Sequence, residues 1–170
     1  AAGYQFVLPW SWGENLSWKG TDGSLPSDLE PYILEQHEGL FLSEGHRTNI
    51  LDDGFREAGI GQVTGEFTLS GTDYNTSMIT QNYALSGNAV FLVGVVYDDL
   101  DGNNFYSPGE GLADVTVSVG GQSTTTWDSG GYQLPLSAGT YEVTFSGGEL
   151  STPATRAVTL SDQNAKLDLV

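Results

Sequence analysis

The second half of the chain alternates apolar and polar residues in several short runs. Every second residue is apolar over 115–119 and 141–145, and the pattern returns at 158–160 and 167–169. Turn residues, mostly glycines, separate the runs. A period of two places alternate side chains on opposite faces of a strand, so these runs predict short strands with one buried face. Many such strands separated by turns predict a β-sandwich.

The first half has a mixed pattern that begins with a helix signal. The segment Ser27-Asp-Leu-Glu30 resembles a capping box, in which the serine caps the helix and the glutamate reaches back to it. The pattern therefore predicts a helix near 28–43. Its partial apolar face is formed by Leu34, Leu40 and Phe41.

The other elements of this half are short or extended. Residues 1–26 are rich in Gly, Ser and Trp, and we expect them to be extended or looped. The pattern then predicts a second short helix within 43–51, followed by strands at 58–69 and 77–85.

A turn at Ser86-Gly-Asn88 marks the expected boundary between two domains, 1–87 and 88–170. A length of 170 residues suits two small domains, and a hydrophobic content of 38% is enough for packed cores. The first domain combines helices with strands and the second contains strands alone, so the expected fold class is α+β.

The chain is strongly acidic, with 22 Asp and Glu against 5 Lys and Arg and a net charge of -17. Phosphate binding needs a basic face, so the charge argues against nucleic acid as a partner. The absence of cysteine excludes disulfide and thiol chemistry. No apolar stretch reaches the ~18 residues of a membrane span.

The clearest chemistry lies in a twelve-residue acidic loop, Asp99-Leu-Asp-Gly-Asn-Asn-Phe-Tyr-Ser-Pro-Gly-Glu110. Oxygen donors stand at loop positions 1, 3, 5 and 12, which are Asp99, Asp101, Asn103 and Glu110. This is the spacing with which a single loop encloses calcium. A solvated surface turn is the alternative interpretation, but the four donors favour calcium.

Four motifs of the first half follow the order and spacing of a known domain. They are Gly13-Glu-Asn-Leu16, Gly45-His-Arg-Thr-Asn-Ile-Leu51, Phe55-Arg-Glu-Ala-Gly-Ile-Gly61 and Ile79-Thr-Gln-Asn-Tyr83. Over residues 3–86 the chain resembles the bacterial, cysteine-free form of the CAP domain, the superfamily of cysteine-rich secretory, antigen 5 and pathogenesis-related-1 proteins. The resemblance implies an α-β-α sandwich.

The CAP resemblance also implies a cleft in which two histidines and two acids hold a divalent metal such as zinc. Glu14 and His46 match two of these positions. The second acid is Glu35 or Glu38, which share a helix face at the i, i+3 spacing, and His37 is a further candidate. The alternative is that His46 orients its helix, because a zinc site generally needs three or more protein ligands.

The first helix of the CAP family carries the other histidine, and nothing before Gly13 matches it. A domain without that helix would expose a core face. We therefore expect this face to be covered by self-association or by a missing N-terminal segment.

Residues 90–170 resemble the B-type repeats of Gram-positive surface adhesins, the SdrD-B and Cna-B-like family. The matching segments are the strand 91–97, Gly111-Leu-Ala-Asp-Val-Thr-Val-Ser118, Thr125-Thr-Trp-Asp-Ser-Gly-Gly-Tyr132 and Gly139-Thr-Tyr-Glu-Val-Thr-Phe145. These repeats are β-sandwich spacers, and SdrD-type members bind calcium in this loop. The resemblance implies as ligands Asp99, Asp101, Asn103, Glu110 and the carbonyl of Phe105.

Three functions are consistent with the sequence. The first is a secreted or cell-surface structural or adhesion protein, in which calcium stiffens the sandwich. The second is a CAP-like module that binds a lipid, sterol or glycan. The third is a metal-assisted hydrolase that uses Glu14 and His46. We favour the first, because the calcium loop has its donors whereas the catalytic set lacks a histidine.

Overall fold

The computed structural model describes residues 3–170 and shows a protein made mostly of strands. Strands take up 48% of the residues, and two helices among the described residues take up 12%. The expected α+β class, with its α-β-α sandwich, is therefore wrong, and the fold is β-rich. The chain divides into two compact units, which we call unit 1, ending at Gly87, and unit 2, comprising Asn88–Val170.

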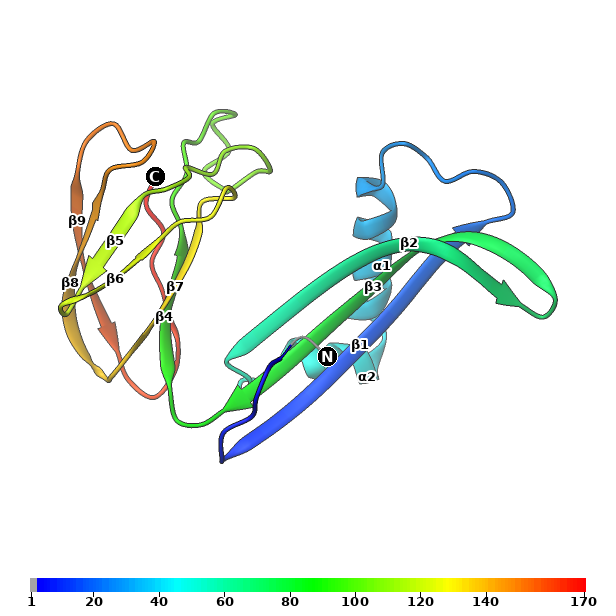
Figure 1. Cartoon of the computed structure of the whole chain (residues 1–170), viewed down its shortest axis with the longest axis horizontal. Coiled ribbons are helices and arrows are strands. Elements are labelled where there is room, and N and C mark those ends of the chain that lie inside the picture. Colours follow the sequence, from blue (N-terminus) through cyan, green and yellow to red (C-terminus); the bar gives the residue numbers. More distant parts are fainter. Residues whose placement is uncertain (1–2) are drawn as a thin grey trace. The chain divides into compact units, whose positions relative to one another are not determined.

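Unit 1 is built on three long antiparallel strands (Figure 1). Strands β1 (Trp10–Thr21) and β2 (Glu57–Leu69) both pair with the central strand β3 (Thr72–Ser86), which gives the order β1-β3-β2. Side chains alternate between the two faces of this sheet. The tryptophan-rich segment that we expected to be extended or looped thus forms a continuous strand of 12 residues.

Both helices of unit 1 pack on the same face of this sheet (Figure 1). They are α1 (Glu30–Leu42) and α2 (Glu44–Ile50), close to the predicted positions. The predicted capping box does not form, because Leu29 is the N-cap residue and makes no side-chain capping bond. An α-β-α sandwich needs helices on both faces of the sheet, and the described residues place them on one.

The buried side of α1 also differs from the prediction. Leu40 is buried, but Leu34 and Phe41 are exposed, and Gln36 is the second buried residue. The sheet opposite α1 is polar. Gln36 Nε2 donates to the carbonyl oxygen of Ser77 at 3.1 Å, and Ser77 Oγ donates to Gln36 Oε1 at 3.0 Å. A buried amide is stable here because its hydrogen bonds are satisfied.

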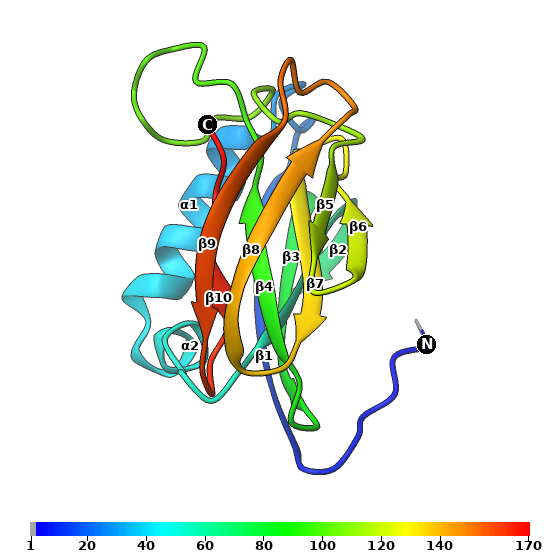
Figure 2. The ribbon, with the colours of Figure 1, turned by 90° about the vertical axis from the view of Figure 1, so that its left-hand side faces the viewer.

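Unit 2 is a sandwich of two sheets (Figure 2). One sheet has the strand order β10-β4-β7 and the other has the order β6-β5-β8-β9. The strands are β4 (Val90–Val95), β5 (Thr116–Val119), β6 (Gln122–Thr125), β7 (Gly131–Leu136), β8 (Gly139–Ser146), β9 (Ala154–Leu160) and β10 (Ala165–Lys166).

The core of unit 2 lies between its two sheets. Val117, Val143 and Phe145 of one sheet are fully buried, and they belong to one cluster with Leu92 and Tyr132 of the other. The rings of Tyr132 and Phe145 meet edge to face across the core, with centroids 5.9 Å apart. The buried face predicted from the alternation at 115–119 and 141–145 is confirmed at these positions.

Hydrogen bonds join the segment just before β1 to the end of β3. The N–H of Gly87 lies 2.8 Å from the carbonyl oxygens of both Val7 and Pro9. The N–H of Val7 donates to Ser86 Oγ at 2.9 Å. The segment that precedes β1 therefore lies beside the end of β3.

Candidate metal centre

The acidic loop connects β4 and β5, which belong to different sheets of unit 2. Asp99, Asp101 and Glu110 each offer a carboxylate oxygen there, and these atoms all lie within 4.8 Å of one another. Among the described residues this is the one group of three or more His, Asp or Glu side chains that could hold a metal ion. Three of the predicted ligands are thus brought together.

Glu110 is 5% exposed and anchors the loop. Its Oε1 accepts hydrogen bonds from the backbone N–H groups of Leu100 at 3.0 Å and Asp101 at 3.3 Å, and its Oε2 accepts one from Ser107 at 2.7 Å. At the base of the loop, the N–H of Asp98 donates to the carbonyl of Glu110 at 3.0 Å. These charge-assisted bonds curve the loop around one buried carboxylate.

Asp99 and Asp101 organise the tip of the loop. Asp99 Oδ1 accepts the N–H of Asn103 at 3.1 Å, and Asp99 Oδ2 accepts the N–H of Asn104 at 3.0 Å. Asp101 Oδ1 accepts the N–H of Asn103 at 3.0 Å. Asn104 stands at loop position 6 with φ of 60°. Asparagine tolerates this left-handed region better than most residues, which explains the turn without a glycine.

The side chain of Asn103 presents its nitrogen to the carboxylates. Its Nδ2 donates to Asp101 Oδ2 at 2.8 Å, and its Oδ1 accepts the N–H of Phe105 at 2.6 Å. A cation is ligated by an amide oxygen, so the side-chain amide of Asn103 must rotate to exchange its nitrogen and oxygen before it can serve as a ligand. The roles predicted for Asn103 and for the carbonyl of Phe105 stay predictions.

Ser107 was missed by the sequence reasoning. Its Oγ donates to Asp101 Oδ2 at 3.0 Å and lies 3.1 Å from Asn103 Nδ2. Ser107 occupies loop position 9, where calcium loops place a ligand, often through a water molecule. The position in the loop was the signal that could have identified it.

In the part of the chain that the structure describes, no basic side chain forms an ion pair with the three carboxylates. The two ion pairs found in residues 3–170 are Lys19–Glu35 and Lys166–Asp168, and neither includes a residue of the loop. Carboxylates this close together repel one another when they are ionised. The loop therefore carries an excess of negative charge, and it could hold a metal ion that balances this charge.

Glu14 and His46 lie on opposite sides of the sheet in unit 1. Asn15 is fully buried and bonds to the backbone of α2, so its neighbour Glu14 projects from the face without helices. His46 belongs to α2, where its Nδ1 lies 2.8 Å from Ser43 Oγ.

The remaining cleft candidates have other partners or face solvent. Glu35 pairs with Lys19, and Glu38 is exposed. His37 Nδ1 lies 3.0 Å from Gln81 Nε2. Over the described part of the chain, none of these side chains joins a group that could hold a metal ion.

Three of the four motifs of the first half meet instead in a cluster of amides. Asn15 Nδ2 lies 3.0 Å from the carbonyl oxygen of His46 and 3.1 Å from Gln81 Oε1, and Asn49 Nδ2 donates to Asn15 Oδ1 at 2.9 Å. A Cβ atom on Gly13 would lie 2.8 Å from Asn49 Oδ1, so the glycine makes room for the cluster. These residues fasten α2 to the sheet.

No protein-family model matches this chain, and no curated protein matches it. Within residues 3–170, no helix has both the length and the apolarity to cross a bilayer. The function is therefore inferred from the residues of the chain itself.

Proposed function

We propose that unit 2 is a calcium-stabilised structural module of a secreted or cell-surface adhesion protein. One observation supports this most. Three carboxylates converge in a loop between the two sheets, and within residues 3–170 no basic side chain forms an ion pair with them. A divalent cation would replace their repulsion with attraction.

The donor set favours calcium over zinc and magnesium. All candidate ligands are oxygens, whereas zinc sites in proteins are usually built from Cys and His. The loop offers donors at positions 1, 3, 5, 7, 9 and 12, and calcium accepts six to eight oxygens in a flexible geometry. Magnesium demands a near-ideal octahedron and usually keeps several of its waters.

The ion would act as a clamp between sheets. The loop leaves β4 in one sheet and enters β5 in the other, so fixing the loop also fixes the two sheets relative to each other. A ligand that binds the folded state alone stabilises it by mass action. Extracellular calcium modules bind with dissociation constants of roughly 0.1–1 mM, which suits a secreted or surface protein.

The resemblance of residues 90–170 to adhesin repeats supports the same role, since those repeats are spacers. The placement of Glu14 and His46 on opposite faces gives the hydrolase hypothesis no support. A structural role for unit 2 is thus the function that the geometry supports best.

The proposal is tested by thermal unfolding followed by circular dichroism, with calcium or with a chelator. If calcium is present at 10 to 100 times its dissociation constant, it adds about 1.4–2.7 kcal/mol of stability. For a unit of this size that raises Tm by roughly 5–20 °C. Glu110→Gln should abolish the shift, and Asp101→Asn should reduce it.

Asp162→Asn is the matched control, because it removes one exposed acid of unit 2 outside the loop. It should keep the full shift. Identical melting with calcium and with chelator would refute the proposal. A shift produced by zinc but not by calcium would change the identity of the metal and leave the site in place.

A further inference from the structure

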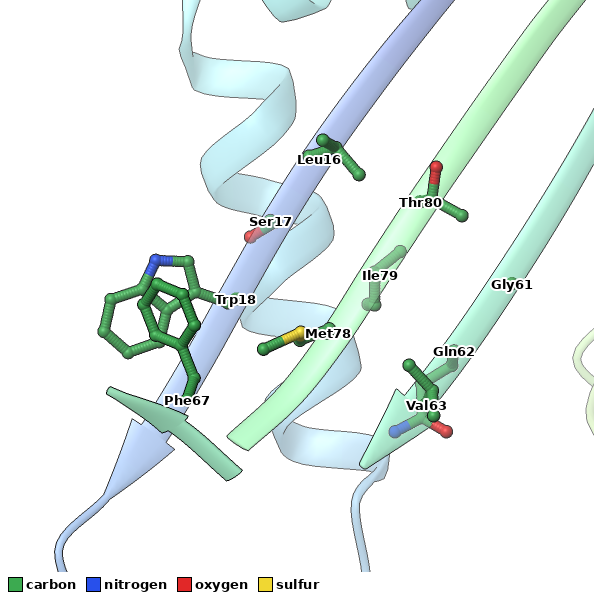
Figure 3. Close-up of a pocket in the computed structure, with 10 residues that line it drawn as sticks. All are labelled: Leu16, Ser17, Trp18, Gly61, Gln62, Val63, Phe67, Met78, Ile79 and Thr80. Atoms are coloured by element: carbon green, nitrogen blue, oxygen red, sulfur yellow. The ribbon is translucent and has the colours of Figure 1, made fainter. Parts of the chain in front are cut away.

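Over residues 3–170, the sheet of unit 1 has one face that no helix covers, and this open face is largely apolar (Figure 3). The register places Trp18 of β1 and Val63 of β2 on either side of Met78 of β3, all on this face. Figure 3 shows their side chains in front of the strands, with α1 behind. The large apolar side chains of the open face include those of Trp10, Trp12, Leu16, Trp18, Val63 and Phe67.

The open face has a ridge and a hollow. The ridge is the row of large side chains along β1, and the rings of Trp18 and Phe67 meet at its end with centroids 5.2 Å apart. The hollow follows β2, where Gly59, Gly61 and Gly65 fall on the open face and contribute no side chain. A groove of about 470 Å³ lies between them.

The exposed apolar area is large for one sheet of three strands. Trp10, Trp12 and Trp18 are 49%, 59% and 42% exposed, and Leu16 and Val63 are both 62% exposed. A whole aromatic side chain has about 150–250 Å² of surface. Multiplied by these exposed fractions and added to the aliphatic side chains, this gives roughly 600 Å² of exposed apolar surface on the face. That matches the upper end of the largest patch on a typical monomer, about 300–600 Å². Two such faces bury about 1,200 Å², the lower limit of a specific interface.

The charges of the face argue against a nucleic acid as its occupant. Glu14 and Glu57 are the charged residues that the register places on it, and Tyr4 donates a hydrogen bond to Glu57 at 2.8 Å. The one basic residue in the three strands, Lys19, pairs with Glu35 of α1 on the other face. The partner that binds the open face is therefore expected to present a mainly apolar surface with few charges.

We propose that the open face binds the open face of a second copy of this chain. A two-fold axis parallel to β3 would lay the ridge of each copy over the glycine hollow of the other, so one surface supplies both complementary shapes. The two sheets would stack as in a β-sandwich, about 10 Å apart. Glu14 lies within the ridge, between Trp12 and Leu16, and the two-fold axis would bring Glu14 and Glu57 to the same end of the interface as the same acids of the second copy. Over the three described strands, the rest of the face carries no charged residue.

Sedimentation equilibrium at micromolar concentration, with calcium and with chelator, tests the dimer. The wild-type mass should be twice 18.1 kDa in both conditions, since unit 1 contributes no residue to the calcium loop. The dimer and the calcium site can thus fail separately. Leu16→Glu should weaken dimerisation at least about 100-fold, because it buries an unpaired charge. Glu14→Gln should strengthen it.

Ile60→Glu is the matched control. Ile60 is 71% exposed on β2, but it pairs with Gln81 and so faces the side that carries the helices. This variant should dimerise like the wild type. A wild-type monomer at all concentrations would refute the proposal, as would a Leu16→Glu dimer of unchanged affinity. A monomer that co-purifies with a lipid, seen by native mass spectrometry, would assign the face to that ligand instead.

Discussion

Unit 2 buries mainly apolar side chains, whereas unit 1 buries mainly polar ones. Of the buried apolar side chains in the described residues, 14 lie in unit 2, whereas unit 1 contains Leu40 and Ile79. Unit 1 buries amides and hydroxyls instead, namely those of Asn15, Gln36, Thr76, Ser77 and Gln81. One unit is thus stabilised by an apolar core and the other by a hydrogen-bonded network. The same kind of substitution should have different effects in the two units.

The largest effect is expected for Phe145→Ala in unit 2. Phe145 is fully buried between the sheets, so its truncation should lower the free energy of unfolding by about 3–5 kcal/mol. Urea unfolding with peptide-resolved hydrogen exchange would assign the loss to unit 2. The control is Leu34→Ala on the exposed side of α1, which should change stability by less than about 0.5 kcal/mol. Equal losses of stability in Phe145→Ala and Leu34→Ala would contradict the difference between the two units.

A smaller effect is expected for Asn15→Ala in unit 1. The substitution removes one hydrogen bond each from Asn49, Gln81 and the carbonyl of His46, which should cost about 2–3 kcal/mol in total. Hydrogen exchange should rise in α2 and in the middle of β3. Asn82→Ala, an exposed asparagine of the same sheet, is the matched control and should have little effect. If Asn15→Ala were neutral, the amide network would not be what holds unit 1 together.

A pH-dependent effect should distinguish unit 2 further. Burial, and then the negative charge of Asp168, raise the pKa of Tyr132 above its ordinary value. The folded state therefore holds the phenolic proton more tightly than the unfolded state. This contribution is complete below pH 10 and is lost as the pH rises from there toward the folded pKa, by up to about 1.4 kcal/mol per pH unit.

The measurement is the urea midpoint of unit 2 between pH 8 and pH 11. Tyr132→Phe should flatten the alkaline loss, while it also removes the hydrogen bond to Leu167 at 2.6 Å, worth about 1 kcal/mol. Tyr141→Phe serves as the control and should keep the wild-type pH profile. An unchanged profile in Tyr132→Phe would show that another group causes the alkaline loss.

Sequence pattern predicted the interior of unit 2 better than that of unit 1. The alternation at Val117, Val143 and Phe145 is a local property, and in a sandwich the apolar set faces inward. In β1 the apolar set, such as Trp12 and Leu16, lies on the open face, while the polar Asn15 faces the helices. In β1, a rule that places apolar side chains inside would therefore indicate the wrong side of the sheet, and in α1 only Leu40 of the three predicted apolar residues is buried.

The candidate metal site was accessible to sequence reasoning because its residues all lie in one loop. Asp99, Asp101 and Glu110 are held together by local turns, so their spacing determines their geometry. Glu14 and His46 are distant in sequence. The distance between them depends on which face of the sheet Glu14 points to and on which face α2, with His46, packs. A motif shows that such residues are present, but it does not show which face each one occupies.

The hydrogen bonds from Gly87 to Val7 and Pro9 have a consequence for how this protein can be rearranged. They join the segment before β1 to the end of β3, so the chain between Val7 and Gly87 leaves and returns to one place. A stretch of chain whose ends lie together can be joined at those ends and opened at an exposed loop, because such a circular permutation does not require the backbone to be stretched.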